Sequence, residues 1–228
     1  MSFTEQLKFN FLENSRWQFI LTGLKNTLII AFFAVIVGLV LGFLIALVRS
    51  THDKSGRFRI LNVICHVYLT VIRGTPVMVQ LLIVYYVIFA SVNIDKILVA
   101  VIAFGLNSAA YVAEIIRSGI MSIDPGQTEA GRSLGLNFSQ TTWLIILPQA
   151  LRNVLPALAN EFIVLLKETS ISGYIGLMDL TRGGDIIRSQ TYEALFPLLM
   201  VALIYLLMVM VLSWLVSRLE RRLRVSER

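Results

Sequence analysis

The chain has 228 residues, of which 57% are hydrophobic and 15% are charged, and its net charge is +6. Soluble domains average about 25% charged residues, so this chain has too few polar residues to cover the surface of a soluble protein. Its 14 glycines, 5 prolines and single cysteine exclude a collagen-like, a disordered and a disulfide-stapled protein. The basic residues cluster beside apolar runs, which is typical of a membrane protein and argues against a nucleic-acid-binding groove.

Five apolar segments follow one another along the chain, and we expect each of them to cross the membrane as a helix. They are residues 26–48, 60–94, 97–116, 150–166 and 194–217. The first and the last contain no charged residue and are long enough to cross roughly 30 Å of hydrocarbon. The second carries Arg73 and is too long for one straight crossing, so we expect it to bend near Pro76.

The distribution of basic residues predicts the orientation in the membrane. Five crossings place on one side three segments that hold twelve of the twenty Lys and Arg residues: 49–59, 117–152 and 218–228. The positive-inside rule makes this side cytoplasmic, so the C-terminus lies inside and the N-terminus outside. We therefore divide the chain into an N-terminal segment (1–19), a membrane domain (20–217) and a basic cytoplasmic tail (218–228).

Two segments on the outer side have alternative interpretations. The N-terminal segment carries apolar residues among polar ones, and it is either an interfacial amphipathic helix or a frayed polar tail. Residues 168–193 mix four glycines with charged residues, and we expect a loop there. That loop is either a solvated connection or a surface that docks a partner outside the membrane.

The longest cytoplasmic segment contains residue types at a spacing that predicts a compact elbow, residues 127–147. The sequence Glu129-Ala130-Gly131-Arg132-Ser133-Leu134-Gly135 is followed by nine residues and then by Ile145-Ile146-Leu147-Pro148. We expect two short helices joined at Gly135, because glycine adopts the positive φ that a sharp turn requires. We expect Glu129 to cap the first short helix and Pro148 to lie in the first turn of the next long helix.

This elbow resembles the EAA loop of ATP-binding-cassette importer permeases. The resemblance rests on residues at matching spacing: Glu129, Ala130, Gly135, Ile145, Leu147 and Pro148. Gly131 replaces the second alanine of the family pattern, which we expect to weaken the short helix by up to about 1 kcal/mol. Other stretches are similar to the polar amino acid branch of the family: 71–76 with Gln80, 107–114, 124–127, 160–162 and 179–180.

The resemblance covers residues 20–220 and implies an all-α integral membrane fold of five transmembrane helices with a cytoplasmic coupling elbow, as in type I importers. It implies a permease subunit in a bacterial inner membrane that takes a polar amino acid from an extracytoplasmic solute-binding protein. It also implies a second permease half, identical or homologous, and two cytoplasmic ATPase subunits coupled to the elbow. We expect no nucleic acid among its partners.

Sequence motifs give no sign of catalysis in this chain. No Gly-x-x-x-x-Gly-Lys-Ser/Thr sequence occurs to hold a nucleotide phosphate, and no hydrolytic motif occurs either. We therefore expect no catalytic residue, no metal and no cofactor here, with ATP and Mg²⁺ bound by the ATPase partners.

Polar residues inside the crossings are costly and need an explanation. Several recur at helical spacing and predict polar faces on three helices: Arg73, Thr75, Gln80, Asn107, Tyr111, Glu114, Asn160 and Glu161. We expect these faces to line a path for the substrate, in which Glu161 would suit a cationic or zwitterionic molecule. The alternative is that they only join helices, for example by an ion pair between Arg73 and Glu114 or Glu161.

Two other function classes stay open from the sequence. A secondary transporter usually shows inverted repeats with broken helices, and this chain shows no internal self-similarity. A membrane scaffold without transport would need neither the polar faces nor an elbow of defined spacing. Recovery of an ATPase subunit with the chain in mild detergent would distinguish the importer from both.

Overall fold

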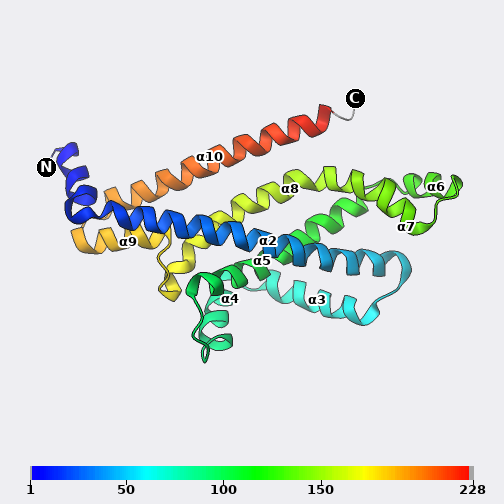
Figure 1. The fold of residues 1–228 in the computed structure, drawn as a ribbon, viewed down its shortest axis with the longest axis horizontal. Coiled ribbons are helices and arrows are strands. Elements are labelled where there is room, and N and C mark those ends of the chain that lie inside the picture. The colour runs from blue at the N-terminus through cyan, green and yellow to red at the C-terminus, as the bar shows by residue number, and fades with distance from the viewer. Residues whose placement is uncertain (1, 226–228) are drawn as a thin grey trace.

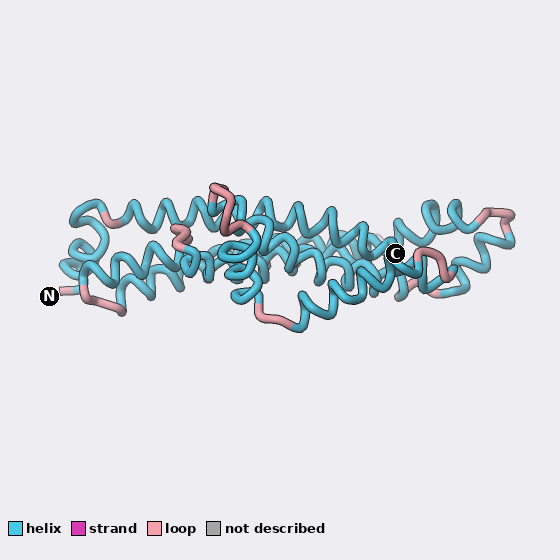
Figure 2. Tube along the Cα trace, turned by 90° about the horizontal axis from the view of Figure 1, so that it is seen from below, coloured by secondary structure: helices cyan, strands magenta, loops and turns pink. Residues whose placement is uncertain are grey.

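The computed structural model describes residues 2–225, which form helices joined by short connections and contain no strand (Figures 1 and 2). The long helices are α2 (Trp17–Ser55), α3 (Arg59–Gly74), α5 (Lys96–Met121), α8 (Leu147–Glu168), α9 (Leu180–Thr191) and α10 (Leu195–Val225). Shorter helices are α1 (Phe3–Leu7), α4 (Val77–Ile83), α6 (Pro125–Ser133) and α7 (Phe138–Thr141). Single π or 3₁₀ turns cover Lys8–Leu12, Glu13–Ser15, Val84–Ile88, Thr142–Ile146 and Thr169–Ile175.

Helices α2, α5, α8 and α10 run along the long axis of the molecule (Figure 1). Helices α2 and α5 approach each other closely, because glycines at their contact have no side chain. A Cβ atom on Gly38 would lie 2.8 Å from the Ser108 Oγ atom, and one on Gly42 would lie 2.6 Å from Val112. Helices α3, α8 and α9 pack against this pair, whereas α10 packs mainly against α8 and α9.

Three helices are long and apolar enough to cross a membrane by themselves, namely α2, α5 and α10, among the described residues. A fourth candidate consists of α3 followed by α4 and the turn Val84–Ile88, which meet at an angle of 110°. The break falls at Thr75 and Pro76, so the predicted bend near Pro76 is confirmed. Helix α8, our remaining predicted crossing, does not qualify by hydropathy, but it packs against both α5 and α10.

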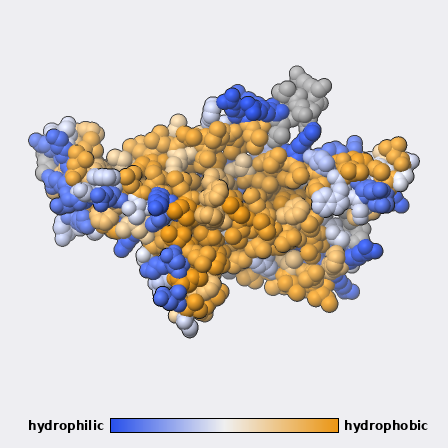
Figure 3. Space-filling model, in the orientation of Figure 1, coloured by the Kyte–Doolittle hydropathy of each residue, from blue (hydrophilic) through white to orange (hydrophobic). Residues whose placement is uncertain are grey.

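The surface agrees with a molecule embedded in lipid. A broad apolar band covers the middle of the molecule, with hydrophilic residues toward both ends of the long axis (Figure 3). The α2–α3 turn, α6, α7 and the C-terminal end of α10 lie toward one end, and the N-terminus and α9 lie at the other (Figure 1). The described parts of the three predicted cytoplasmic segments (49–59, 117–152 and 218–225) therefore lie toward the same end, and residues 226–228 of the predicted tail lie outside the described residues.

The expectation of a loop at residues 168–193 is wrong. This segment forms the 3₁₀ turn Thr169–Ile175 and helix α9, in which Leu180 and Ile187 are fully buried. A Cβ atom on Gly183 would lie 2.5 Å from the backbone oxygen of Phe19. Gly183 therefore permits close packing of α9 against α2, and Gly184 permits it against α10, where a Cβ atom would lie 2.4 Å from Val201.

The N-terminal segment is folded onto this same end, so the frayed-tail interpretation is wrong. Phe11 is buried in a cluster with Leu180 and Ile187 of α9. Asn10 is fully buried, and its Nδ2 atom donates hydrogen bonds to the Gln6 carbonyl and to the Glu193 carboxylate, the latter at 2.5 Å.

Asp179 begins α9 and lies outside the candidate membrane spans, yet it is fully buried. Its Oδ1 atom accepts a hydrogen bond from the Arg182 backbone N–H at 3.1 Å, while Oδ2 has no partner in the described structure. Burial raises the pKa of Asp179 to about 6. The backbone N–H donors of α9 and the Arg182 charge have the opposite effect on this pKa, but burial is the larger of the effects. The Arg182 guanidinium itself pairs with Asp185 at 2.8 Å.

Asp179→Asn should therefore stabilise the protein in a pH-dependent way. The ionised carboxylate costs up to about 3 kcal/mol in the folded state, and this cost grows as the pH rises through 3.8 and is complete above about 6. Asparagine still caps the helix and carries no charge. We expect a higher melting temperature for the variant at pH 8 and a difference that shrinks toward pH 4. Asp124→Asn makes the same change at an exposed cap and is the matched control.

Candidate functional site

A cavity of about 440 Å³ lies between α3, α5 and α8. Its lining combines a cation, two carboxylates, hydroxyls and an amide with a few apolar groups. The lining residues are Arg73, Tyr111, Glu114, Ile115, Ser118, Gly119, Ser122, Asn153, Val154, Ala157 and Glu161. Four of the eight predicted path residues therefore meet in one space: Arg73, Tyr111, Glu114 and Glu161.

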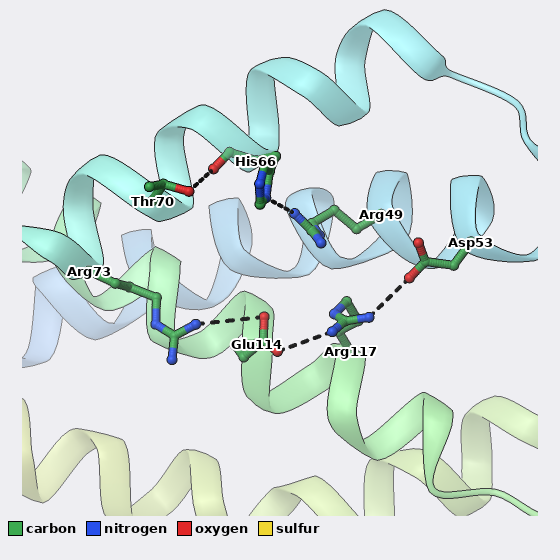
Figure 4. Close-up of polar contacts among 7 residues, drawn as sticks. All are labelled: Arg49, Asp53, His66, Thr70, Arg73, Glu114 and Arg117. Atoms are coloured by element: carbon green, nitrogen blue, oxygen red, sulfur yellow. Dashed lines mark hydrogen bonds and ion pairs between the residues drawn. The ribbon is translucent and has the colours of Figure 1, made fainter.

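Arg73 reaches across the cavity from α3 toward α5 (Figure 4). Its Nη1 atom lies 3.9 Å from Oε2 of Glu114, and its guanidinium carbon lies 5.8 Å from the centre of the Tyr111 ring. The long ion-pair distance and the half-exposed Arg73 side chain indicate a loose contact that stabilises the bundle little. The Arg73–Glu114 ion pair that the helix-joining alternative named is present, and both groups still line the cavity.

The ion pairs continue from the cavity toward the elbow end of the bundle. Glu114 also accepts from Arg117 at 3.3 Å, and Arg117 pairs with Asp53 of α2 at 3.0 Å (Figure 4). The chain Arg73–Glu114–Arg117–Asp53 thus joins α3, α5 and α2. A change in the position of α5 would alter the charges that face the cavity.

Glu161 enters the cavity from α8 and is buried, with 8% of its surface exposed. Its Oε1 atom accepts a hydrogen bond from the Ser108 hydroxyl at 3.2 Å. No cation pairs with it in the described structure, so the alternative of an Arg73–Glu161 ion pair is not present here. A buried carboxylate without a counter-charge is costly, and a positively charged ligand in the cavity would offset that cost.

Three predicted path residues have another role, because Thr75, Gln80 and Asn107 do not line the cavity. The Gln80 Nε2 atom donates to the Ile72 carbonyl at 2.7 Å and to the Thr75 carbonyl and hydroxyl at 3.0 and 2.9 Å. Its Oε1 atom accepts from Asn107 of α5 at 2.9 Å. For these three residues the structure favours the helix-joining alternative: they fasten the break between α3 and α4 to α5.

Gln80→Leu should consequently destabilise the fold. The apolar side chain removes the donor for two backbone carbonyls and leaves the buried Asn107 amide without its acceptor, which costs about 1–3 kcal/mol. The variant should melt at a lower temperature in detergent than the parent. Gln190→Leu on the exposed side of α9 makes the same replacement and should leave the melting temperature nearly unchanged.

Asn160, predicted beside Glu161 on the path, does not line this cavity. The two are adjacent on α8, so their side chains point in different directions. Asn160 is exposed and lines a hollow against α10 together with Ser213, Ser217 and Glu220, and this hollow adjoins the cavity because both include Asn153 and Ala157. The cavity instead uses Ser118 and Ser122, which sequence reasoning missed although they continue the helical spacing of Tyr111 and Glu114 along α5.

The elbow has the two short helices that were predicted, α6 and α7, and Gly135 joins them with a φ of +80°. The Gly135 N–H donates to the Arg132 carbonyl at 3.0 Å, and the Leu136 N–H donates to the Gly131 carbonyl at 3.1 Å. These two bonds form a Schellman motif, which closes the end of α6. The predicted conformation of Gly135 is confirmed.

Asp124, not Glu129, caps α6, so the capping role expected for Glu129 is wrong. The Asp124 Oδ1 atom accepts from the Gly126 N–H at 2.7 Å. Glu129 lies past the first turn, is exposed, and makes no hydrogen bond or ion pair within the described structure. Its carboxylate is therefore available to a partner, as is the apolar side chain of Leu134, which is 79% exposed at the end of α6.

Gly131, the residue that departs from the family pattern, has a packing role. It is buried, and a Cβ atom there would lie 2.7 Å from Thr141 Cγ2 and 3.2 Å from Ile145 Cδ1. The close contact presses α6 against α7 and the turn Thr142–Ile146. Among the motif residues, Ile145 therefore packs the turn Thr142–Ile146 against α6.

The remaining motif residues connect the elbow to the bundle. Leu147 is buried at the start of α8, and Pro148 occupies its first turn, as predicted. Ala130 is exposed on α6. At the other end, α5 runs from the cavity directly into the elbow, and a Cβ atom on Gly119 of α5 would lie 2.0 Å from Val154 of α8. The two helices that the elbow joins are therefore in tight contact beside the cavity.

Comparisons with known proteins agree with this arrangement. Residues 38–225 match the family described as binding-protein-dependent transport system inner membrane component. The chain is 41% identical over 211 residues to the arginine transport system permease protein ArtQ of Bacillus subtilis, covering 92% of this chain and 94% of that protein. It is 39% identical over 209 residues to the glutamine transport system permease protein GlnP of Escherichia coli, covering 90% and 93%.

Solved structures give the same result. A chain of an amino acid ABC transporter crystallised with histidines is 42% identical and superposes with a TM-score of 0.85, covering 97% of this chain and 99% of that one. A chain of the MetNI methionine ABC transporter is 20% identical, with a TM-score of 0.77, and supports the fold alone. The chain belongs to the binding-protein-dependent transport system inner membrane components, as an amino acid permease subunit of the ATP-binding-cassette type.

Proposed function

We propose that this permease moves a polar amino acid through the cavity between α3, α5 and α8, driven by ATP that partner subunits hydrolyse. The observation that supports it is the combination of Arg73 with Glu114 and Glu161 around one space of about 440 Å³. An amino acid carries a carboxylate and an ammonium group, and these would find their opposite charges on α3 and on α5 or α8. Serine and tyrosine hydroxyls would complete the hydrogen bonds.

The elbow is proposed to transmit the force. Each of two ATPase subunits, which bind ATP and Mg²⁺, would receive one elbow, with Glu129 and Leu134 exposed toward it. A second permease half, identical or homologous, would complete the path. The extracytoplasmic solute-binding protein would dock at the opposite end, and the basic segments would face the cytoplasm, with the N-terminus outside.

The proposed cycle is alternating access. Closure of the ATPase pair draws the two elbows together and opens the cavity outward to the loaded binding protein, and hydrolysis releases them and exposes it inward. Helices α5 and α8 are suited to this, because each leads from the elbow to the cavity. Movement of α5 relative to α3 would also change the distance between Glu114 and Arg73, while the Glu114–Arg117 pair, which lies within α5, would move as a unit.

The test is reconstitution of the chain with its ATPase and binding-protein partners in liposomes. Uptake of radiolabelled basic, amide, acidic and sulfur-containing amino acids is measured with ATP inside the vesicles. We expect uptake of at least one class that requires both ATP and the binding protein. Uptake driven by an ion gradient without ATP would support a secondary transporter instead, and an ATPase that does not co-purify, together with absent uptake, would favour a scaffold.

A further inference from the structure

A second cavity, of about 270 Å³, lies at the elbow end, away from the substrate cavity. Its walls come from the end of α2, the α2–α3 turn, the end of α5, and the segment from α7 to the start of α8. Apolar side chains form most of the lining: Leu47, Ile120, Phe138, Trp143, Ile146 and Leu147. Polar groups complete it: Ser50, Thr51, Arg57, Ser139 and Thr142. The lining therefore offers four hydroxyls and one guanidinium beside an apolar wall.

From this lining we propose that the cavity binds the headgroup of an anionic phospholipid of the cytoplasmic leaflet, with the phosphate on Arg57 and the hydroxyls. Guanidinium and hydroxyl groups are hydrogen-bond donors that suit phosphate oxygens. The apolar wall would contact the glycerol and the first carbons of the acyl chains. A free phosphate ion has no apolar part that could contact this wall. The combination of polar and apolar lining therefore favours a lipid.

The surroundings of the cavity place it at a membrane surface. Large apolar side chains are exposed around it, including Trp143 (59%) and its neighbour Leu144 (67%). Phe58, next to Arg57, is 55% exposed and is held at a φ of +58° by the sharp α2–α3 turn. Tryptophan with exposed aliphatic groups is typical of the interface between hydrocarbon and headgroups.

The charge around the α2–α3 turn favours an anion. Residues 49–59 contain four basic residues and one acidic residue, Asp53. The Asp53 carboxylate pairs with Arg117 at 3.0 Å and lies 4.0 Å from His52, so basic residues outnumber acidic ones in this segment. Basic pockets between helices on the cytoplasmic side are known settings for anionic headgroups.

A lipid in this position would join two parts of the molecule. One wall belongs to α2, which is the centre of the bundle, and the opposite wall belongs to α7 and the turn Thr142–Ile146 of the elbow. The headgroup would hold the elbow against the bundle. This gives the anionic lipid a structural place in the permease that does not depend on the substrate cavity.

The test uses the purified chain in mild detergent, with native mass spectrometry to count bound phosphatidylglycerol and phosphatidylcholine added at equal concentration. We expect one tightly held phosphatidylglycerol. Arg57→Gln should weaken its binding roughly five- to tenfold, the effect of one basic residue near a headgroup. Arg59→Gln, an exposed basic residue two positions away that does not line the cavity, is the matched control and should change binding little.

Several results would overturn the proposal. Equal retention of the two lipids, or equal loss in both variants, would show that the cavity makes no specific contact with a headgroup. Displacement of phosphatidylglycerol by millimolar inorganic phosphate would show a soluble anion as the ligand. None of these readouts depends on transport, so they are independent of the proposed function.

Discussion

Gly135→Val should reduce uptake at least roughly tenfold while the chain still inserts, assembles and permits basal ATP hydrolysis. Gly135 has a φ of +80° at the junction of the two elbow helices. A β-branched residue there costs about 1–2 kcal/mol or more in backbone strain, and a difference of 1.4 kcal/mol is tenfold in an equilibrium. The strain would open the Schellman motif and change the angle between α6 and α7. The measurements are ATP-driven uptake and ATP hydrolysis in the same liposomes.

Gly135→Asn is the matched control for this prediction. No atom lies within 4 Å of a Cβ placed on Gly135, so a side chain meets no steric obstacle there and only the backbone conformation matters. Asparagine tolerates positive φ far better than valine, so this variant should retain most uptake. Full uptake in Gly135→Val would show that the bend of the elbow is not needed for coupling.

Glu161→Gln should abolish most uptake without loss of assembly. Glutamine has nearly the same shape and keeps an oxygen that accepts the hydrogen bond from Ser108, but it removes the buried charge. A charge-assisted hydrogen bond to a substrate ammonium group contributes about 1.5–3 kcal/mol, so uptake should fall roughly ten- to hundredfold. The measurement is binding-protein-dependent uptake at substrate concentrations below saturation.

Asn160→Ala provides the comparison for Glu161→Gln on the same helix. Asn160 is exposed and does not line the cavity, although its hollow adjoins the cavity through Asn153 and Ala157, so uptake should remain close to that of the parent. Normal uptake in Glu161→Gln would exclude this carboxylate from the path. Recovery of the ATPase subunit with each variant separates a transport defect from an assembly defect.

The elbow could be predicted almost completely because its determinants are local. A glycine at the turn, a proline at the start of α8 and regular spacing define two short helices wherever the segment lies. The error about Glu129 was also local: Asp124 lies directly before Pro125 and meets the usual preference for a capping residue, whereas Glu129 comes after the first turn.

The polar path residues show the limit of helical spacing. Spacing places Asn107, Tyr111 and Glu114 on one face of α5, but a face is wide enough to meet two neighbours. Asn107 meets Gln80 at the α3–α4 break, and Glu114 meets Arg73 across the cavity. Which contact each residue makes depends on the 110° bend between α3 and α4. The spacing of polar residues along the sequence does not reveal the angle of this bend.

Hydrophobic length, the placement of positive charge and the chemistry of glycine and proline were enough to indicate a helical membrane protein with an elbow, since all of these act locally along the chain. The resemblance of the elbow motif to a known family indicated a permease. Contacts between distant segments decided the rest. The glycine-rich segment 168–193 became a helix with one buried face only because α2 and α10 cover that face, and Arg73, Glu114 and Glu161 became one site only because α3, α5 and α8 converge. Packing of this kind depends on the shapes of several surfaces at once, and no single stretch of sequence carries that information.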